Sequence, residues 1–128
     1  MKPELALLVW AVLLTVVQML VAVAGATAQV GLPVLAANRE GLAPCSGWAG
    51  RAARAHHNML ENLVLFAALV LTAVVAGRTN GATLLGAQLF LWARLAYAVI
   101  YVAGIPWLRT AVWFVSVIGL VIIFLQLL

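Results

Sequence analysis

The sequence contains few charged residues and a single cysteine. Seven of its 128 residues are lysine or arginine and three are aspartate or glutamate. Charged side chains therefore make up 8% of the chain, against roughly a quarter in an ordinary soluble domain. So few charges cannot cover a surface that faces water. The lone cysteine, Cys45, excludes an intrachain disulfide and every metal site that needs several cysteines.

The basic residues do not form a run, although they give the chain a formal net charge of +4. They are spread singly or in pairs between apolar stretches. Binding to nucleic acid needs basic residues gathered on one surface or in one segment. We therefore expect no nucleic-acid partner, and we interpret these residues as topology signals and site residues.

Long apolar stretches dominate the sequence, which is 67% hydrophobic. A transmembrane helix needs about 20 apolar residues, and four stretches reach this length: 5–30, 51–76, 82–103 and 107–128. The last three are joined by short links, which make neighbouring helices antiparallel. The sequence predicts an all-α integral membrane protein, an antiparallel bundle of four transmembrane helices in a single domain (residues 1–128) that contacts the lipid bilayer.

The longest connection, 31–50, holds two prolines, four glycines and the polar stretch Asn38-Arg39-Glu40. The basic residues on its side of the predicted bundle are Arg39, Arg51, Arg54 and Arg109, against Lys2 and Arg78 on the other side. Cytoplasmic loops carry the excess of lysine and arginine. We expect loop 31–50 in the cytoplasm, and both termini on the non-cytoplasmic side of the cell inner membrane.

The second predicted span begins with a polar stripe formed by Arg51, Arg54, Asn58 and Glu61. At about 100° per residue these side chains fall within a quarter of the helix circumference. An ionisable group near the membrane centre costs at least about 2.5 kcal/mol, so such groups persist where they meet each other, a cavity or a ligand. One alternative stays open, in which the arginines extend to the interface while Glu61 pairs with Arg54.

The third predicted span carries Arg94, Tyr97 and Tyr101 on one face, at i, i+3 and i+7. Arg94 lies near the middle of its span, too far from either end to reach the interface easily. Glu61 is the only acidic residue within a predicted span. Two interior arginines, Arg54 and Arg94, therefore face one carboxylate, and a bound anion would restore the balance.

Other polar residues occur near the same end of the bundle. Arg109 and Thr110 open the fourth predicted span on the side of Arg54 and add a cation and a hydroxyl. His56 and His57 are adjacent, so they point about 100° apart and cannot chelate one metal ion from the same helix. We expect no metal site, and interfacial hydrogen bonding for both histidines.

These spacings resemble a known family, the membrane-associated proteins in eicosanoid and glutathione metabolism (MAPEG). The family includes microsomal glutathione transferases, prostaglandin E synthase and the leukotriene synthase. Its core pattern is Arg-x-x-x-Asn-x-x-Glu in the second span. Here the pattern is met by Arg54, Asn58 and Glu61, accompanied by Arg94, Tyr101 and the pair Arg109 and Thr110. The resemblance spans nearly the whole chain.

The resemblance implies a homotrimer that binds glutathione at each subunit boundary, near the cytoplasmic face. The implied activity is that of a glutathione-dependent transferase or peroxidase acting on lipophilic electrophiles in the membrane. The implied glutathione contacts are Arg51, Arg54, Asn58, Glu61, Arg94, Tyr97 and Tyr101. Arg109 would stabilise the thiolate, with Thr110 or Tyr101 as the hydrogen-bond donor.

The chain departs from the family pattern at three positions. Gly31 stands where relatives often have arginine, Gly50 where they often have an acidic residue, and Leu65 where they often have proline. They imply that one ligand contact is missing and that the second span is straighter than in relatives, so ligand binding is expected to survive these departures more readily than catalysis. Two other functions therefore stay open, a small oligomeric transporter that uses Glu61 as its binding carboxylate and a non-catalytic membrane protein with the same fold.

Overall fold

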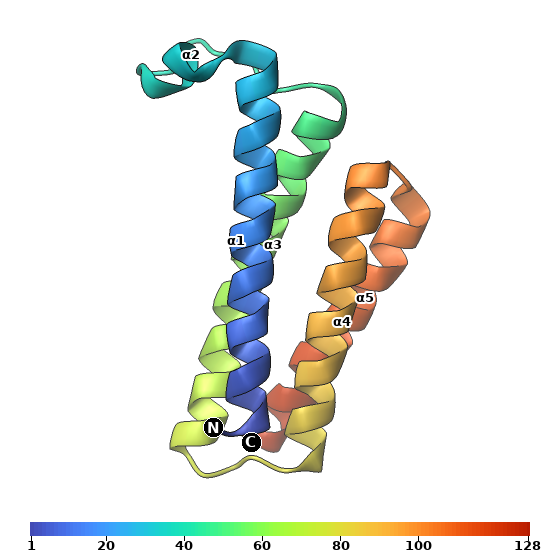
Figure 1. Ribbon diagram of the computed structural model, residues 1–128. Coiled ribbons are helices and arrows are strands. Elements are labelled where there is room, and N and C mark those ends of the chain that lie inside the picture. Colours follow the sequence, from blue (N-terminus) through green and yellow to red (C-terminus); the bar gives the residue numbers. More distant parts are fainter.

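The computed structural model describes residues 1–128 and contains five helices (Figure 1). They are α1 (Pro3–Val30), α2 (Leu32–Ala36), α3 (Gly47–Val75), α4 (Gly81–Ala103) and α5 (Pro106–Gln126). All except the short α2 are long and apolar enough to cross a membrane. Both termini lie at one end of the bundle and α2 lies at the other, so successive spanning helices run antiparallel (Figure 1). The chain is an all-α, multi-pass integral membrane protein, as the sequence predicts.

The helix ends follow from local chemistry. Pro3, Pro33 and Pro106 each stand in the first turn of a helix, where a missing backbone N–H leaves no bond unmade. Asn80 caps α4, since its side-chain oxygen accepts from the Thr83 backbone N–H at 2.9 Å and its own N–H donates to the Thr83 hydroxyl at 2.8 Å. Gly104 ends the same helix with a φ of 84°, a conformation that favours glycine.

One predicted boundary is wrong, because α3 begins at Gly47 and not at Arg51. The loop is correspondingly shorter, and it includes α2. A pair of hydrogen bonds from α1, called the Gln29 clasp below, explains why α3 starts earlier than predicted. The Gln29 side chain donates to the Ser46 carbonyl at 2.7 Å and accepts from the Ser46 N–H at 3.1 Å. Ser46 is the N-cap residue of α3, so this clasp fixes where α3 begins against the end of α1.

The expectation that Glu61 is the only acidic residue within a span is also wrong. Helix α1 begins at Pro3 and includes Glu4, whose side chain is only 4% exposed. One of its carboxylate oxygens has no hydrogen-bond partner. Glu4 lies at the terminus end of the bundle, far along the helices from α2. It therefore does not neutralise the arginines near the other end.

The core of the bundle is built from aromatic stacking and close helix contact. Phe66 of α3 stacks on Phe90 of α4 with ring centroids 4.1 Å apart. Gly86 and Gly119 let α4 and α5 approach closely, since a Cβ at Gly86 would lie 2.6 Å from the Gly119 carbonyl oxygen. Small residues permit such contact between membrane helices. Towards the α2 end, the α1–α3 and α4–α5 pairs separate (Figure 1).

Candidate functional site

A polar cavity of about 450 Å³ lies between α3, α4 and α5. It is lined by Arg54, His57, Asn58 and Glu61 from α3, Tyr97 and Tyr101 from α4, and Arg109 from α5. Its volume falls within the range of about 300 to 1,000 Å³ that is common for small-molecule sites. The structure thus brings together most of the residues that the sequence singles out, from three different helices.

Tyr101 is the centre of the contacts in this cavity. Its hydroxyl oxygen accepts a hydrogen bond from Arg54 Nε at 3.2 Å. The Arg109 guanidinium lies 4.5 Å from the centroid of its ring, within the range of a cation–π contact. Because the oxygen acts as the acceptor for Arg54, the phenolic hydrogen remains available for a ligand. Arg54 bonds to Tyr101, which argues against the alternative in which it forms an ion pair with Glu61.

Asn58 is oriented by the next turn of its own helix. Asn62, which is buried, donates from Nδ2 to the Asn58 backbone carbonyl at 2.8 Å and to its side-chain oxygen at 3.2 Å. These bonds use the acceptor atoms of Asn58 and leave its side-chain N–H groups for a ligand. Glu61, one turn along, is exposed at the edge of the cavity. The cavity therefore presents an amide donor beside a carboxylate.

Arg94 does not line the cavity. Its side chain is 1% exposed, and none of its three guanidinium nitrogens has a hydrogen-bond partner. It packs against the Tyr97 ring, with the guanidinium carbon 4.1 Å from the ring centroid. Since Tyr97 does line the cavity, its ring separates the Arg94 charge from the cavity space.

Arg51 and Thr110 also lie outside the cavity lining. Arg51 donates from Nε to the Val102 carbonyl at 2.9 Å, near the end of α4, where a cation stabilises the last carbonyl groups of a helix. The Thr110 hydroxyl donates to the Pro106 carbonyl at 3.2 Å. Both side chains are thus engaged by the backbone at the edge of the site.

His57 is a cavity residue that the sequence analysis assigned to the interface. It lines the cavity beside Asn58, whereas its neighbour His56 does not. The sequence spacing does indicate that His57 faces the cavity. His57 lies three residues after Arg54 and four before Glu61, spacings that put all three side chains on one helix face.

The structure gives a physical reason for two of the departures from the family pattern. Gly31 has a φ of 84° between α1 and α2, so a side chain there would be strained. At Gly50, an added Cβ would overlap the Cys45 carbonyl oxygen and lie 3.3 Å from Arg54 Nη1. This path of the loop leaves no room for an acidic side chain. Leu65 is exposed on α3, and the structure offers no reason for it.

Comparison with known proteins agrees with this architecture. A family model described as the MAPEG family matches residues 4–128, essentially the whole chain. No curated protein and no solved structure matches the chain significantly. The family model confirms the resemblance expected from the spacing of Arg54, Asn58 and Glu61 in a four-span sequence. The chain belongs to the MAPEG family, which includes glutathione transferases and related membrane proteins.

Proposed function

We propose that this protein is a glutathione-dependent transferase or peroxidase that acts on lipophilic electrophiles dissolved in the bilayer. The observation that carries the proposal is the cavity between α3, α4 and α5, which gathers two arginines, a carboxylate, an amide and two tyrosines. Glutathione has two carboxylates, one ammonium and one thiol. It therefore needs cations for its anionic groups, an anion for its ammonium and hydrogen-bond donors, and the lining of this cavity contains all three kinds of group.

The peptide part of glutathione is assigned to the α3 side of the cavity. Arg54 would bind a carboxylate through the guanidinium nitrogens that its bond to Tyr101 leaves free. Glu61 would bind the ammonium, and the Asn58 amide would donate to a peptide carbonyl. Hydrogen bonds to charged groups contribute about 1.5 to 3 kcal/mol each. Arg94 would add a positive charge behind Tyr97, and Arg51 would act indirectly by holding the end of α4.

The thiol is assigned to the other side of the cavity, near Arg109 and Tyr101. Arg109 would stabilise the thiolate, and the free phenolic hydrogen of Tyr101 would donate to its sulfur. Tyr101 suits this role better than Thr110, because the Thr110 hydroxyl already donates to the Pro106 carbonyl. In the transferase reaction, the thiolate sulfur forms a bond to an electrophilic carbon of the substrate, and the leaving group departs with the electron pair of the bond that breaks.

One arginine is sufficient to activate the thiol. Moving a thiol pKa from about 8.5 to about 6.5 requires roughly 2.7 kcal/mol. A single positive charge about 4 Å from the thiolate supplies about 4 kcal/mol at an effective dielectric constant of about 20. Arg109 is the cation that this proposal places closest to the sulfur.

We further propose that the subunits form a homotrimer with a glutathione site at each boundary, and that the α2 end faces the cytoplasm across the inner membrane. Arg54 and Glu61 are both exposed in a single subunit. A second subunit beside α3 would shield these charges from lipid, which is favourable because charges facing lipid are costly. The basic residues near the α2 end support the orientation.

Calorimetric titration of the purified protein with glutathione tests the proposal directly, followed by the thiolate absorbance at increasing pH and by conjugation of a model electrophile. We expect saturable binding below millimolar concentration and a thiolate signal at a lower pH than for free glutathione. If no binding occurs at millimolar glutathione, the proposal fails. Proton-dependent flux in proteoliposomes would then indicate a transporter that uses Glu61, and its absence a non-catalytic membrane protein.

A further inference from the structure

A second cavity, of about 400 Å³, lies beneath α2 and is separate from the polar cavity. Its walls come from the second half of α1, from α2 and from the start of α3, and most of them are apolar. The two residues that can carry charge are Arg39, which follows α2, and His56 of α3. In Figure 1, α2 and the following loop extend sideways from the end of α1. The cavity is thus apolar along the bundle, and Arg39 forms a basic rim at its loop end.

Arg39 is held in an unusual conformation at this rim. It is the one non-glycine residue with a positive φ, 62°, a backbone conformation that is uncommon for such residues. Its side chain turns back over α2, and Nε donates to the Leu35 carbonyl at 2.7 Å. That bond uses only one edge of the guanidinium group. Its two terminal nitrogens remain as paired donors, an arrangement that suits the oxygens of a phosphate or carboxylate.

His56 lines the same cavity from α3, deeper in the bundle than Arg39. Its Nδ1 atom is buried and has no hydrogen-bond partner, which is unusual for a buried polar atom. His57 lines the polar cavity and His56 does not, so the two adjacent histidines line different cavities. Arg39 is therefore the cation at the loop end of this cavity, and His56 lines its deeper part.

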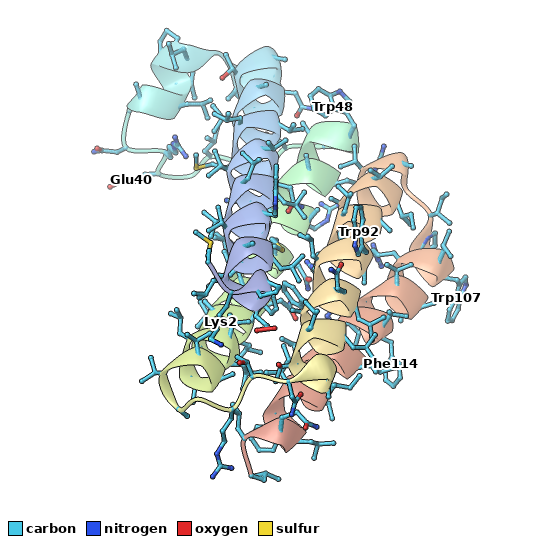
Figure 2. The ribbon with its side chains drawn as sticks, turned by 60° about the horizontal axis from the view of Figure 1, so that its bottom comes forward. Lys2, Glu40, Trp48, Trp92, Trp107 and Phe114 are labelled. Carbon is cyan, nitrogen blue, oxygen red and sulfur yellow. The ribbon has the colours of Figure 1, made fainter.

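No carboxylate lines this cavity. Glu40, the residue after Arg39, lies at the outer edge of the loop and points away from the bundle in Figure 2. Along α1, Met19 and Val23 line the cavity and are also substantially exposed. The apolar wall is thus open sideways to the surrounding lipid, while the basic rim lies at the end of the span.

We propose that this cavity binds an anionic phospholipid of the surrounding leaflet. Its phosphate would lie against Arg39 at the loop end of the cavity. One acyl chain would follow α1 from Ala26 to Met19, a rise of about 10.5 Å along the helix, and the other would lie in the bilayer through the open side. The order of groups along the cavity matches that of a lipid in its leaflet, with the charged end at the membrane surface. Anionic lipids are attracted to basic residues at this depth.

Native mass spectrometry of the purified full-length protein tests this proposal. The protein is incubated with phosphatidylglycerol or with phosphatidylcholine of the same acyl chains, and the retained lipid is compared. We expect about tenfold more retained phosphatidylglycerol. Arg39→Ala should abolish this preference, because it removes the paired donors. Arg78→Ala is the matched control, since Arg78 is an exposed arginine at the opposite end of the bundle, and it should retain the preference.

A second variant separates cavity binding from general attraction to charge. Ala22→Phe fills the apolar part of the cavity and leaves Arg39 intact, so it should reduce the retained phosphatidylglycerol about tenfold. Circular dichroism identifies the variants that are folded. Equal retention of the two lipids by the wild type would overturn the proposal. So would an unchanged preference in folded Arg39→Ala, or stronger retention of a long-chain fatty acid than of phosphatidylglycerol.

Discussion

The Arg94 guanidinium lies 4.1 Å from the centroid of the Tyr97 ring, with no hydrogen-bond partner for any of its nitrogens. The cation–π contact offsets only part of what burial of this charge costs, since such contacts contribute about 2 kcal/mol when desolvated, whereas an unpaired buried ion costs several kcal/mol. Tyr97 also lines the polar cavity, whereas Arg94 does not. The positive charge of Arg94 therefore lies next to a residue that lines the proposed glutathione site.

Arg94→Met should stabilise the ligand-free protein and weaken its ligand binding. Methionine keeps much of the side-chain volume and removes the unpaired charge, and such replacements are often neutral or stabilising by about 1 to 4 kcal/mol. The lost charge should weaken glutathione binding about tenfold. Thermal denaturation in detergent and calorimetric titration measure the two effects. A lower melting temperature with unchanged glutathione affinity would contradict this role.

Arg54→Ala should mainly weaken glutathione binding and Arg51→Ala should mainly lower the melting temperature, although the two arginines are one turn apart. Arg54 lines the cavity, so its loss should weaken glutathione binding about tenfold or more, the equivalent of a hydrogen bond to a charged group. Arg51 bonds to the end of α4, so its loss should lower the melting temperature and leave the affinity within a few fold. Calorimetry and thermal denaturation of both variants provide the comparison. The assignment is wrong if Arg51→Ala has the larger effect on affinity.

Much of the fold was predictable because the apolar spans are long and their ends carry strong signals. Pro106 and the glycines between spans limit where helices can continue, and the predicted ends agree with the structure within a few residues. The start of α3 was not predictable. It depends on Gln29 holding Ser46, a contact between residues that are distant in the sequence and that no periodicity reveals.

The site was predictable where one helix face carries the pattern. The spacing of Arg54, Asn58 and Glu61 puts them on one stripe of α3, and they do line one cavity. The positions of Arg94 and Arg51 were not predictable, because each depends on a neighbouring group, the Tyr97 ring or the Val102 carbonyl. Periodicity gives the face of a helix but not which side chain on that face reaches the cavity.

Gly50→Ala should destabilise the protein, because its Cβ would overlap the Cys45 carbonyl oxygen. Overpacking of this kind typically costs about 1 to 3 kcal/mol. Gly81→Ala is the matched control, since Gly81 also lies in the first turn of a helix and a Cβ there would meet no atom within 4 Å. That variant should be unchanged or slightly stabilised, as alanine favours helix over glycine. Equal melting temperatures for the two variants would show that the loop moves aside without cost.

Single cysteines at Asn38 and Asn80, introduced after Cys45 has been replaced, should react from opposite sides of the membrane. Asn38 follows α2 at one end of the bundle, and Asn80 begins α4 at the other end. We expect a membrane-impermeant thiol reagent added to intact cells to label the Asn80 variant, because the basic residues favour a cytoplasmic α2 end. Labelling of Asn38 alone would reverse the orientation, and labelling of both from outside would contradict the four-span topology.

Arg109→Ala should separate catalysis from binding. The Arg109 guanidinium lies against the Tyr101 ring, and the proposed function assigns it to the thiolate. Its removal should leave glutathione affinity within a few fold, raise the pKa of the bound thiol and slow conjugation of a model electrophile by at least tenfold. Thiolate absorbance against pH and single-turnover kinetics measure these effects. Arg109→Lys, which keeps the charge, should recover part of the rate. A variant that loses affinity and rate together would instead assign Arg109 to a glutathione carboxylate, and the thiol would then lie nearer to Arg54.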